Sequence, residues 1–281
     1  MLLGDRLGFG DEIMAAGEAQ RIYEQGGQKV AITDRSGAVR WSDIWRGNPA
    51  IASVEESRLG GVQRIRNGPN ARPYNANMPF TAKSGVKFTD WRARDHRGRI
   101  YLTEDEIAIG RSVRERLGPY WVVEPSPSAR SNPNKRWPFE RFQALVGQVV
   151  AWRWVQPLHK ESQPLDAVRS VSTATFRDAC GLLASAEGYV GTEGGLHHAA
   201  ASLGIPAVVI FGGCMSVETF GYPEHVNLAD DGPESPCGRW LLCAHCTQAM
   251  DRISVDQVLA ACIVIGTPSR RWGPCPGMPG S

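Results

Sequence analysis

The sequence predicts an α/β protein whose two domains face each other across a cleft. Apolar stretches alternate with segments of helical periodicity in the second half of the chain, which is typical of parallel sheets with right-handed crossovers. A Gly-Pro pair at 118–119 follows a helical segment, and 281 residues are enough for two domains. We expect one domain over 1–117, a second over 118–266, and a loose Pro- and Gly-rich tail over 267–281.

The second half carries the clearer pattern. Strands are expected at 121–124, 153–157, 167–171, 188–191 and 206–211, and helices at 137–150, 175–186 and 195–203. The helix at 137–150 has apolar residues at helical spacing. The helix at 175–186 begins at a threonine, a residue type that caps helices. This order predicts a doubly wound parallel sheet with helices on both faces.

The first half is less regular. A helix is expected at 12–25, before Gly26 and Gly27, followed by a strand at 29–33. Residues 67–100 are rich in Gly, Asn, Arg and Pro and predict loops. Thr103, with Glu106 three residues later, forms a capping signature for a helix that ends at Leu117.

Composition excludes several classes of protein. With 42% hydrophobic and 21% charged residues the chain is an ordinary globular protein and not a disordered one. No apolar run approaches the roughly 20 residues that span a bilayer. The first twelve residues carry acids and glycines where a secretion signal needs a cationic start. We therefore expect a cytoplasmic protein, with peripheral attachment to the inner membrane face as an alternative.

Arginine and cysteine are both distributed unevenly. Only five of the 31 basic residues are lysines, which reflects either base composition or a need to bind phosphate or carboxylate. All seven cysteines lie beyond residue 179, and without an export signal they favour metal ligation or buried thiols. The candidate metal ligands are Cys237, Cys243, Cys246 and Cys262, with His245 or Cys214 as substitutes. A structural zinc or iron ion is one interpretation, and reduced thiols packed around a loop are the other.

Three segments combine glycine or proline with charged residues. Asp11 follows two glycines at the start of the first helix, where it is either a functional carboxylate or a helix cap. Lys135 precedes a Trp-Pro pair and is either a phosphate ligand or a solvated loop lysine. Glu193 and the Gly-Gly pair after it join a strand to a helix, the context in which backbone N–H groups hold a diphosphate.

These segments, taken together, resemble glycosyltransferase family 9, the heptosyltransferase family. The resemblance is carried by Gly10-Asp11, by residues 134–138 (NKRWP), by residues 193–198 (EGGLHH), by the turn at 211–213 (FGG) and by the cysteine segment at 237–246. It covers residues 121–259 well and, before them, only 7–19. It implies two Rossmann-like domains facing a cleft (the GT-B fold). Cysteine-rich C-terminal segments recur in the family, and in its autotransporter branch such a segment holds iron.

The resemblance also implies an activity. Family members transfer a sugar, typically heptose from an ADP-linked donor, onto a hydroxyl with inversion and without a metal ion in the reaction. By motif, Asp11 would be the general base and Lys135 would balance donor phosphate charge. Glu193 stands where the family has aspartate, which leaves the identity of the sugar open. The implied donor contacts are Ser126, Lys135, Thr192, Glu193, Gly194, Gly195, Leu196 and His197.

Other functions stay open at this point. The expected acceptor is a glycan or glycolipid of the kind used in lipopolysaccharide biosynthesis. Arginines interleaved with Tyr74 and Trp91 between residues 62 and 100 could instead bind nucleic acid, as in a phage-type enzyme that glycosylates a modified DNA base. A non-catalytic protein that binds nucleotide sugars is a second alternative, although Asp11 and Lys135 argue against it. A sugar-nucleotide epimerase on the same fold is the third.

Overall fold

The computed structural model describes residues 7–68, 72–74, 97–125, 131–149, 151–230, 232–239 and 241–266. The expected tail at 267–281, most of the arginine-rich stretch before residue 97, and Ser126 lie outside these residues. No helix in the described ranges is both long and apolar enough to cross a membrane.

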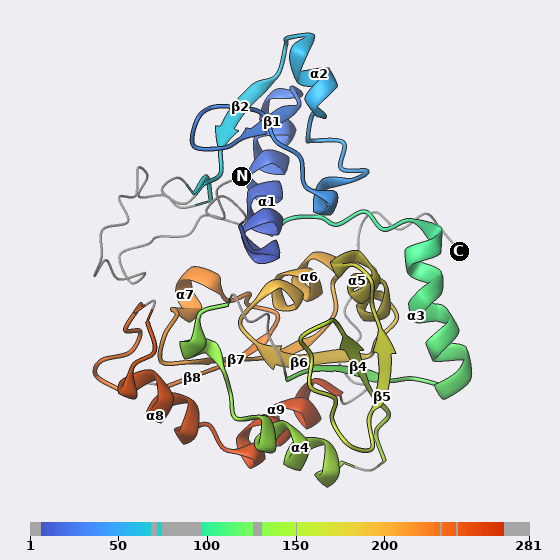
Figure 1. The fold of residues 1–281 in the computed structure, drawn as a ribbon, viewed down its shortest axis with the longest axis vertical. Helices are drawn as coiled ribbons and strands as arrows, with labels where there is room; N and C mark the ends of the chain where they lie inside the picture. The colour runs from blue at the N-terminus through green and yellow to red at the C-terminus, as the bar shows by residue number, and fades with distance from the viewer. Residues whose placement is uncertain are drawn as a thin grey trace.

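A six-stranded parallel sheet forms the centre of the second half (Figure 1). Its strands lie in the order β5-β4-β3-β6-β7-β8. They are β3 (Trp121–Glu124), β4 (Trp154–Leu158), β5 (Arg169–Ser172), β6 (Gly188–Thr192), β7 (Ala207–Gly212) and β8 (Val226–Ala229). The central strands β3, β6 and β7 are apolar and almost wholly buried, as strands covered on both faces must be. This confirms the predicted α/β architecture, with β8 as a strand that the sequence did not predict.

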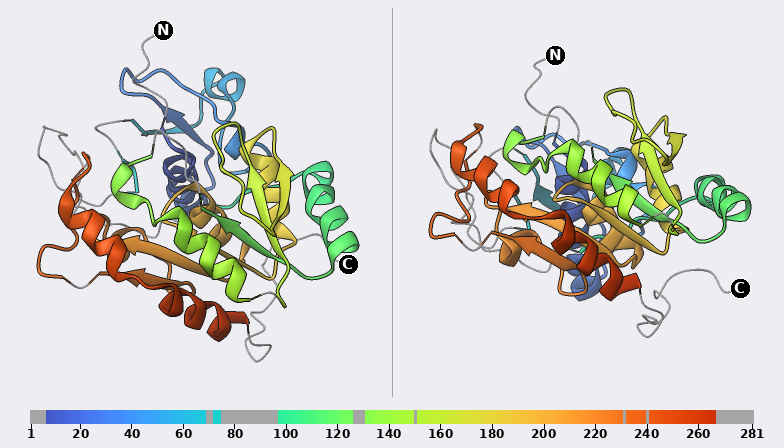
Figure 2. Two further views of the ribbon diagram at one scale, coloured as in Figure 1. Left: turned by 60° about the horizontal axis from the view of Figure 1, so that its bottom comes forward. Right: turned by 90° about the horizontal axis from the view of Figure 1, so that it is seen from below.

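Helices cover both faces of this sheet. The face toward the first half carries α5 (Phe176–Ala184) and α6 (Gly195–Leu203), and the opposite face carries α4 (Phe139–Gln148) and α9 (Val255–Gly266) (Figures 1 and 2). Two shorter helices, α7 (Val217–Phe220) and α8 (Ala244–Arg252), lie toward the β8 edge. The sequence predicted α4, α5 and α6. It did not predict α7, α8 or α9.

The described part of the first half is smaller. It contains α1 (Phe9–Gly26), β1 (Val30–Thr33), η1 (Asp43–Trp45), α2 (Val54–Arg58) and β2 (Gln63–Arg66). The strands β1 and β2 pair in parallel, with Val30 opposite Gln63. The sequence predicted α1 and β1 but not β2, because three of its four residues are exposed and polar and give no buried pattern.

The helix α3 (Glu104–Leu117) connects the two halves and packs on α5. At the point where the two helices cross there is no room for a side chain, since a Cβ on Gly110 would lie 2.2 Å from the carbonyl oxygen of Gly181. The sequence assigned α3 to the first domain. Its close contact with α5 of the second half depends on Gly110 and Gly181, and no local sequence pattern indicates that these two glycines meet.

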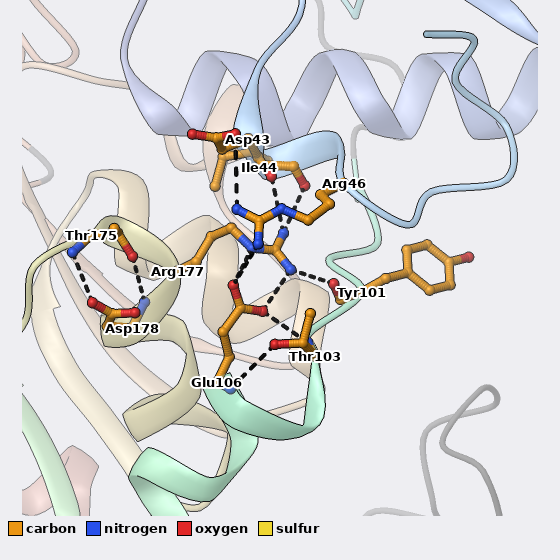
Figure 3. A network of polar contacts seen from close by, with 9 residues as sticks. All are labelled: Asp43, Ile44, Arg46, Tyr101, Thr103, Glu106, Thr175, Arg177 and Asp178. Carbon is orange, nitrogen blue, oxygen red and sulfur yellow. Dashed lines mark hydrogen bonds and ion pairs between the residues drawn. The ribbon is translucent and has the colours of Figure 1, made fainter.

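Arg177 of α5 anchors the first half to this crossing (Figure 3). Its guanidinium donates to both carboxylate oxygens of Glu106 on α3, at 2.6 and 2.7 Å. It also donates to the carbonyl oxygens of Asp43 at 3.1 Å and of Tyr101, which belong to the first half and to the segment before α3. Because Arg177 is 2% exposed, these bonds form a buried polar link between the halves.

The N-terminal turn of α1 lies directly on α6. A Cβ on Gly10 would lie 2.6 Å from the imidazole Cδ2 of His198, so only glycine permits this approach. The same hydrophobic cluster contains Ile13 and Met14 of α1 and Leu196 and Ala199 of α6. The beginning of α1 is therefore held over the beginning of α6.

Candidate functional site

The predicted donor-side residues lie at the carboxyl edge of the six-stranded sheet, where β3 and β6 are neighbours. The chain leaves β3 toward β4 on one side and leaves β6 toward β7 on the other. Such a reversal of strand order leaves a crevice in which α/β proteins bind ligands. Lys135 lies in the loop after β3, and Glu193 in the turn after β6. The topology thus brings residues from two separate motifs to one place.

Lys135 is fixed by its own turn and by an acidic partner. It ends the 3₁₀ turn η3 (Pro133–Lys135), which Asn132 caps by accepting a hydrogen bond from the N–H of Asn134 at 3.0 Å. Its ammonium group forms a buried ion pair with the carboxylate of Glu193. Burial lowers the pKa of Lys135, but Glu193 outweighs burial and leaves that pKa raised. The ammonium therefore stays charged.

Glu193 belongs to a chain of buried polar groups. Its Oε1 lies 3.4 Å from Nε2 of His198, whose Nδ1 lies 2.9 Å from the hydroxyl of Tyr222. Burial raises the pKa of Glu193, but Lys135 and then His198 lower it by more than burial raises it, so that this pKa is about 2. Glu193 is only 3% exposed. Its carboxylate thus holds Lys135 in this structure, a contact that the sequence did not predict.

The turn after β6 provides backbone groups. Thr192 is buried at the end of β6, and Gly194 precedes the first residue of α6. The first N–H groups of a helix have no partner within it, so those of Gly195 and Leu196 can receive an anion. The predicted strand–turn–helix context is present.

The side chain of His197 belongs to the core. It is wholly buried, and its ring lies edge-on to that of Phe211 with centroids 5.6 Å apart. Glu193, His197 and His198 bring ligand atoms within 4.8 Å of one another, a spacing that a metal ion could use. The ammonium of Lys135 already neutralises this carboxylate. A cation there would have to displace it.

Asp11 lies on the facing half, in the first turn of α1. The N-cap of this helix is Gly8, whose N–H donates to Oδ2 of Asp11 at 3.2 Å, so Asp11 is the third helical residue and not the cap. The hydroxyl of Tyr74 donates to Oδ1 at 2.5 Å, and Nε of Arg72 lies 3.3 Å from the same oxygen. In the sequence Arg72 and Tyr74 belong only to an arginine-rich stretch, because no local sequence pattern connects them to Asp11.

The packing of α1 on α6 brings Asp11 of the first half toward Lys135 of the second. The charge of Asp11 contributes to the raised pKa of Lys135, after the larger effects of burial and of Glu193. The contact between Gly10 and His198 accounts for this proximity, since His198 also contacts Glu193. The two residues that the resemblance identifies as catalytic are thus brought toward one space.

The cysteine segment forms a compact cluster. Sγ of Cys237 lies 2.9 Å from Sγ of Cys246 and 3.9 Å from that of Cys243, and Sγ of Cys246 lies 3.8 Å from Nδ1 of His245. All four ligand atoms lie within 4.8 Å of one another. Cys262 lies elsewhere, buried in α9 in the apolar cluster on that face of the sheet. His245, which the sequence offered as a substitute ligand, therefore joins the three cysteines in place of Cys262. Cys243, His245 and Cys246 come together because they are the N-cap and the second and third residues of α8.

Comparison with solved structures finds the same fold in two glycosyltransferases. A glycosyl transferase family 9 protein from Veillonella parvula DSM 2008 matches with a TM-score of 0.62 and 14% identity, over 92% of this chain and 95% of its own. The iron-containing dodecameric glycosyltransferase TibC from enterotoxigenic E. coli H10407 matches with a TM-score of 0.62 and 13% identity, over 92% of this chain and 74% of its own. No family profile matches the sequence, and no curated protein is significantly similar to it. The chain therefore has the GT-B fold of the family 9 glycosyltransferases, as its motifs predicted.

Proposed function

We propose that this protein is an inverting glycosyltransferase that moves a sugar from a nucleotide-diphosphate donor to an acceptor hydroxyl. The observation that carries the proposal is the buried pair of Lys135 and Glu193 at the sheet crevice, with Asp11 on the facing helix. The pair fixes the ammonium group of Lys135, with its N–H donors, where a diphosphate would leave. Asp11 supplies a carboxylate where a hydroxyl would lose its proton.

Asp11 would act as the general base. Its Oδ1 is engaged by Tyr74 and Arg72, whereas Oδ2 accepts one backbone hydrogen bond, from Gly8, and keeps a lone pair for an acceptor hydroxyl. An alcohol is a poor nucleophile near neutral pH, and a positioned base contributes about 10² to 10⁴-fold to the rate. The proton would pass from the acceptor to Asp11 as the new glycosidic bond forms on the face opposite the leaving group.

Lys135 and the beginning of α6 would stabilise the leaving group. The nucleotide diphosphate gains negative charge as the bond to the sugar breaks. An ammonium group and helix N–H groups held in place beforehand stabilise that charge without reorganisation. An ammonium has three donors, so Lys135 can keep Glu193 and still contact a phosphate oxygen.

The finer assignments rest on the family resemblance. They are a heptose or similar sugar, an ADP-linked donor, and a glycan or glycolipid acceptor. The DNA-modifying alternative requires a nucleic acid acceptor, and binding to it would weaken steeply as salt is raised. Acceptor binding measured at two salt concentrations therefore separates the two classes.

The test is nucleotide binding and turnover in matched variants. Titration with ADP, UDP, GDP and CMP should find one class that binds the wild type. Lys135→Ala should weaken that binding about tenfold or more, the value of one charge-assisted hydrogen bond. Lys29→Ala, which removes a lysine paired with Glu56 in the first half, should not. Asp11→Asn should keep nucleotide affinity and lose about 10² to 10⁴-fold in transfer.

Three outcomes would count against the proposal. Absence of binding by every nucleotide would contradict a donor site at Lys135. Conversion of a nucleotide sugar without any acceptor would indicate an epimerase. Binding of the donor without turnover on any acceptor, in wild type and Asp11→Asn alike, would indicate a non-catalytic binding protein.

We also propose that Cys237, Cys243, His245 and Cys246 hold a structural metal ion. Three thiolates and one imidazole are a ligand set that suits tetrahedral zinc or iron, and their atoms already lie within 4.8 Å of one another. Elemental analysis of the purified protein should find about one ion per chain, as a single four-ligand site requires. Cys243→Ser should lose the ion, and Cys262→Ser should keep it. A metal-free wild type with reactive thiols would instead support packed cysteines.

A further inference from the structure

We infer that the cysteine cluster positions Lys135 through two buried asparagines, so that the state of the cluster sets the affinity for the nucleotide. The inference rests on the proposed role of Lys135 in binding the donor. Residues 237–239 and 241–246 are called the cysteine loop. Asn132 and Asn134, which flank Pro133 in the turn that carries Lys135, form the connection.

Asn134 uses its whole side chain on the cysteine loop. Its Nδ2 donates to the carbonyl oxygen of Arg239 at 2.9 Å and to that of Leu241 at 2.8 Å. Its Oδ1 accepts from the N–H of Cys243 at 3.0 Å. The residue is 2% exposed. A residue adjacent to Lys135 is therefore held by three hydrogen bonds to a loop far along the chain.

Asn132 makes a second, parallel connection. Its Nδ2 also donates to the carbonyl oxygen of Arg239, at 2.9 Å, while its Oδ1 caps the turn of Lys135. It is likewise 2% exposed. Both asparagines thus donate to the same carbonyl group of the cysteine loop.

The cysteine loop in turn is fixed at two places. The N–H groups of Cys237 and Gly238 donate to the carbonyl oxygens of Gly213 and Cys214, each at 2.9 Å, which ties the start of the loop to the turn after β7. The cluster of Cys237, Cys243, His245 and Cys246 closes the loop onto the first turn of α8. Between these two fixed places lie Arg239 and Leu241, whose carbonyl oxygens the asparagines use.

Opening the cluster should therefore release Lys135. Without its closing contacts the loop would be free to shift the carbonyl of Arg239, and two buried amides would lose partners. A buried polar group without a partner is unfavourable, so the asparagines would move to recover hydrogen bonds. The turn that they cap would move with them. Lys135 would then lose its fixed position beside Glu193.

The test is a double-mutant cycle read by nucleotide affinity. The probe is the nucleoside diphosphate that the wild type binds, titrated by calorimetry into the full chain. Cys243→Ser opens the cluster and keeps the backbone N–H that Asn134 uses. We expect it to weaken binding about tenfold, the loss of one charge-assisted hydrogen bond. Cys180→Ser, a buried thiol of α5 outside the cluster, serves as the control and should bind like the wild type.

The second arm of the cycle distinguishes positioning from general damage. In a Lys135→Ala background, Cys243→Ser should cause no further loss of affinity, because the two changes act on the same contact. Asn134→Ala leaves the thiols intact and should reproduce the loss. It also serves as the variant of choice should Cys243→Ser fold poorly, with thermal unfolding monitored for every protein.

Each result decides the matter. Unchanged affinity in both Cys243→Ser and Asn134→Ala would overturn the inference and leave the proposed function intact. An equal further loss in the Lys135→Ala background would also overturn it, since the effect would not pass through Lys135. A wild type that binds no nucleoside diphosphate would overturn the proposed function and, with it, this inference.

Discussion

Glu124 is a titratable group at the end of β3 whose environment makes the protein sensitive to pH. It accepts a hydrogen bond from the hydroxyl of Tyr189 on β6 at 2.6 Å. Burial raises the pKa of Glu124 from 4.5 to about 7, and the bond from Tyr189 only partly offsets this. The folded protein therefore holds a proton on Glu124 at pH values where the unfolded chain has released it.

The sign of the resulting pH dependence follows from this difference. Between pH 4.5 and about 7 the native state binds more protons than the unfolded state, so the stability that Glu124 contributes falls as pH rises through that window. Glu124→Gln should remove this slope and stabilise the protein by up to about 3.5 kcal/mol above pH 7, at about 1.4 kcal/mol per pKa unit. Urea unfolding at pH 5, 6, 7 and 8 would measure it. Parallel pH profiles for the variant and the wild type would show that Glu124 has an ordinary pKa.

At the scale of elements, the crossing of α3 and α5 depends on one buried ion pair and two glycines. Arg177 and Glu106 form a buried pair (Figure 3). The crossing of Gly110 and Gly181 lies beside it, since a Cβ on Gly181 would meet the backbone of Glu106. The pKa of Glu106 is lowered because Arg177 and the cap at Thr103 outweigh its burial. The carboxylate therefore stays charged and the pair intact near neutral pH.

Removal of Arg177 should leave a buried negative charge. We expect Arg177→Met to lower the free energy of unfolding by about 3 to 5 kcal/mol, the usual cost of breaking a buried ion pair from one side. Arg177→Met combined with Glu106→Leu should recover part of this loss, because no uncompensated charge remains. Arg111→Met, which affects an exposed pair with Glu104, is the control and should change stability by under about 1 kcal/mol. Equal small losses in all three would show that Arg177 does not connect the halves energetically.

The whole molecule places one half of the candidate site on each of two unequal units. The larger unit fixes Lys135 and Glu193 at the reversal of strand order in its sheet, and the smaller brings Asp11 by laying α1 on α6. Arg177 and the shared hydrophobic cluster hold the two units together in this facing arrangement.

The sequence by itself determined the α/β alternation, five of the six strands of the large sheet, and the segments that carry Asp11, Lys135 and Glu193. Those features are local: they follow from apolar runs, helical spacing, caps and short motifs. It missed β8 and β2, whose residues are only partly buried or exposed, and the helices α2, α7, α8 and α9.

Only the tertiary structure decided which side chains meet. Two contacts join distant parts of the chain. Lys135 pairs with Glu193, and Tyr74 donates a hydrogen bond to Asp11. In the cysteine cluster His245, and not Cys262, lies beside the three cysteines. No pattern within a helix or strand encodes such contacts, because they depend on how sheet order and helix packing bring loops together. The motifs indicate which reactive side chains are present. The packing of α1 on α6 and of the cysteine loop on Asn134 determines where those side chains come together.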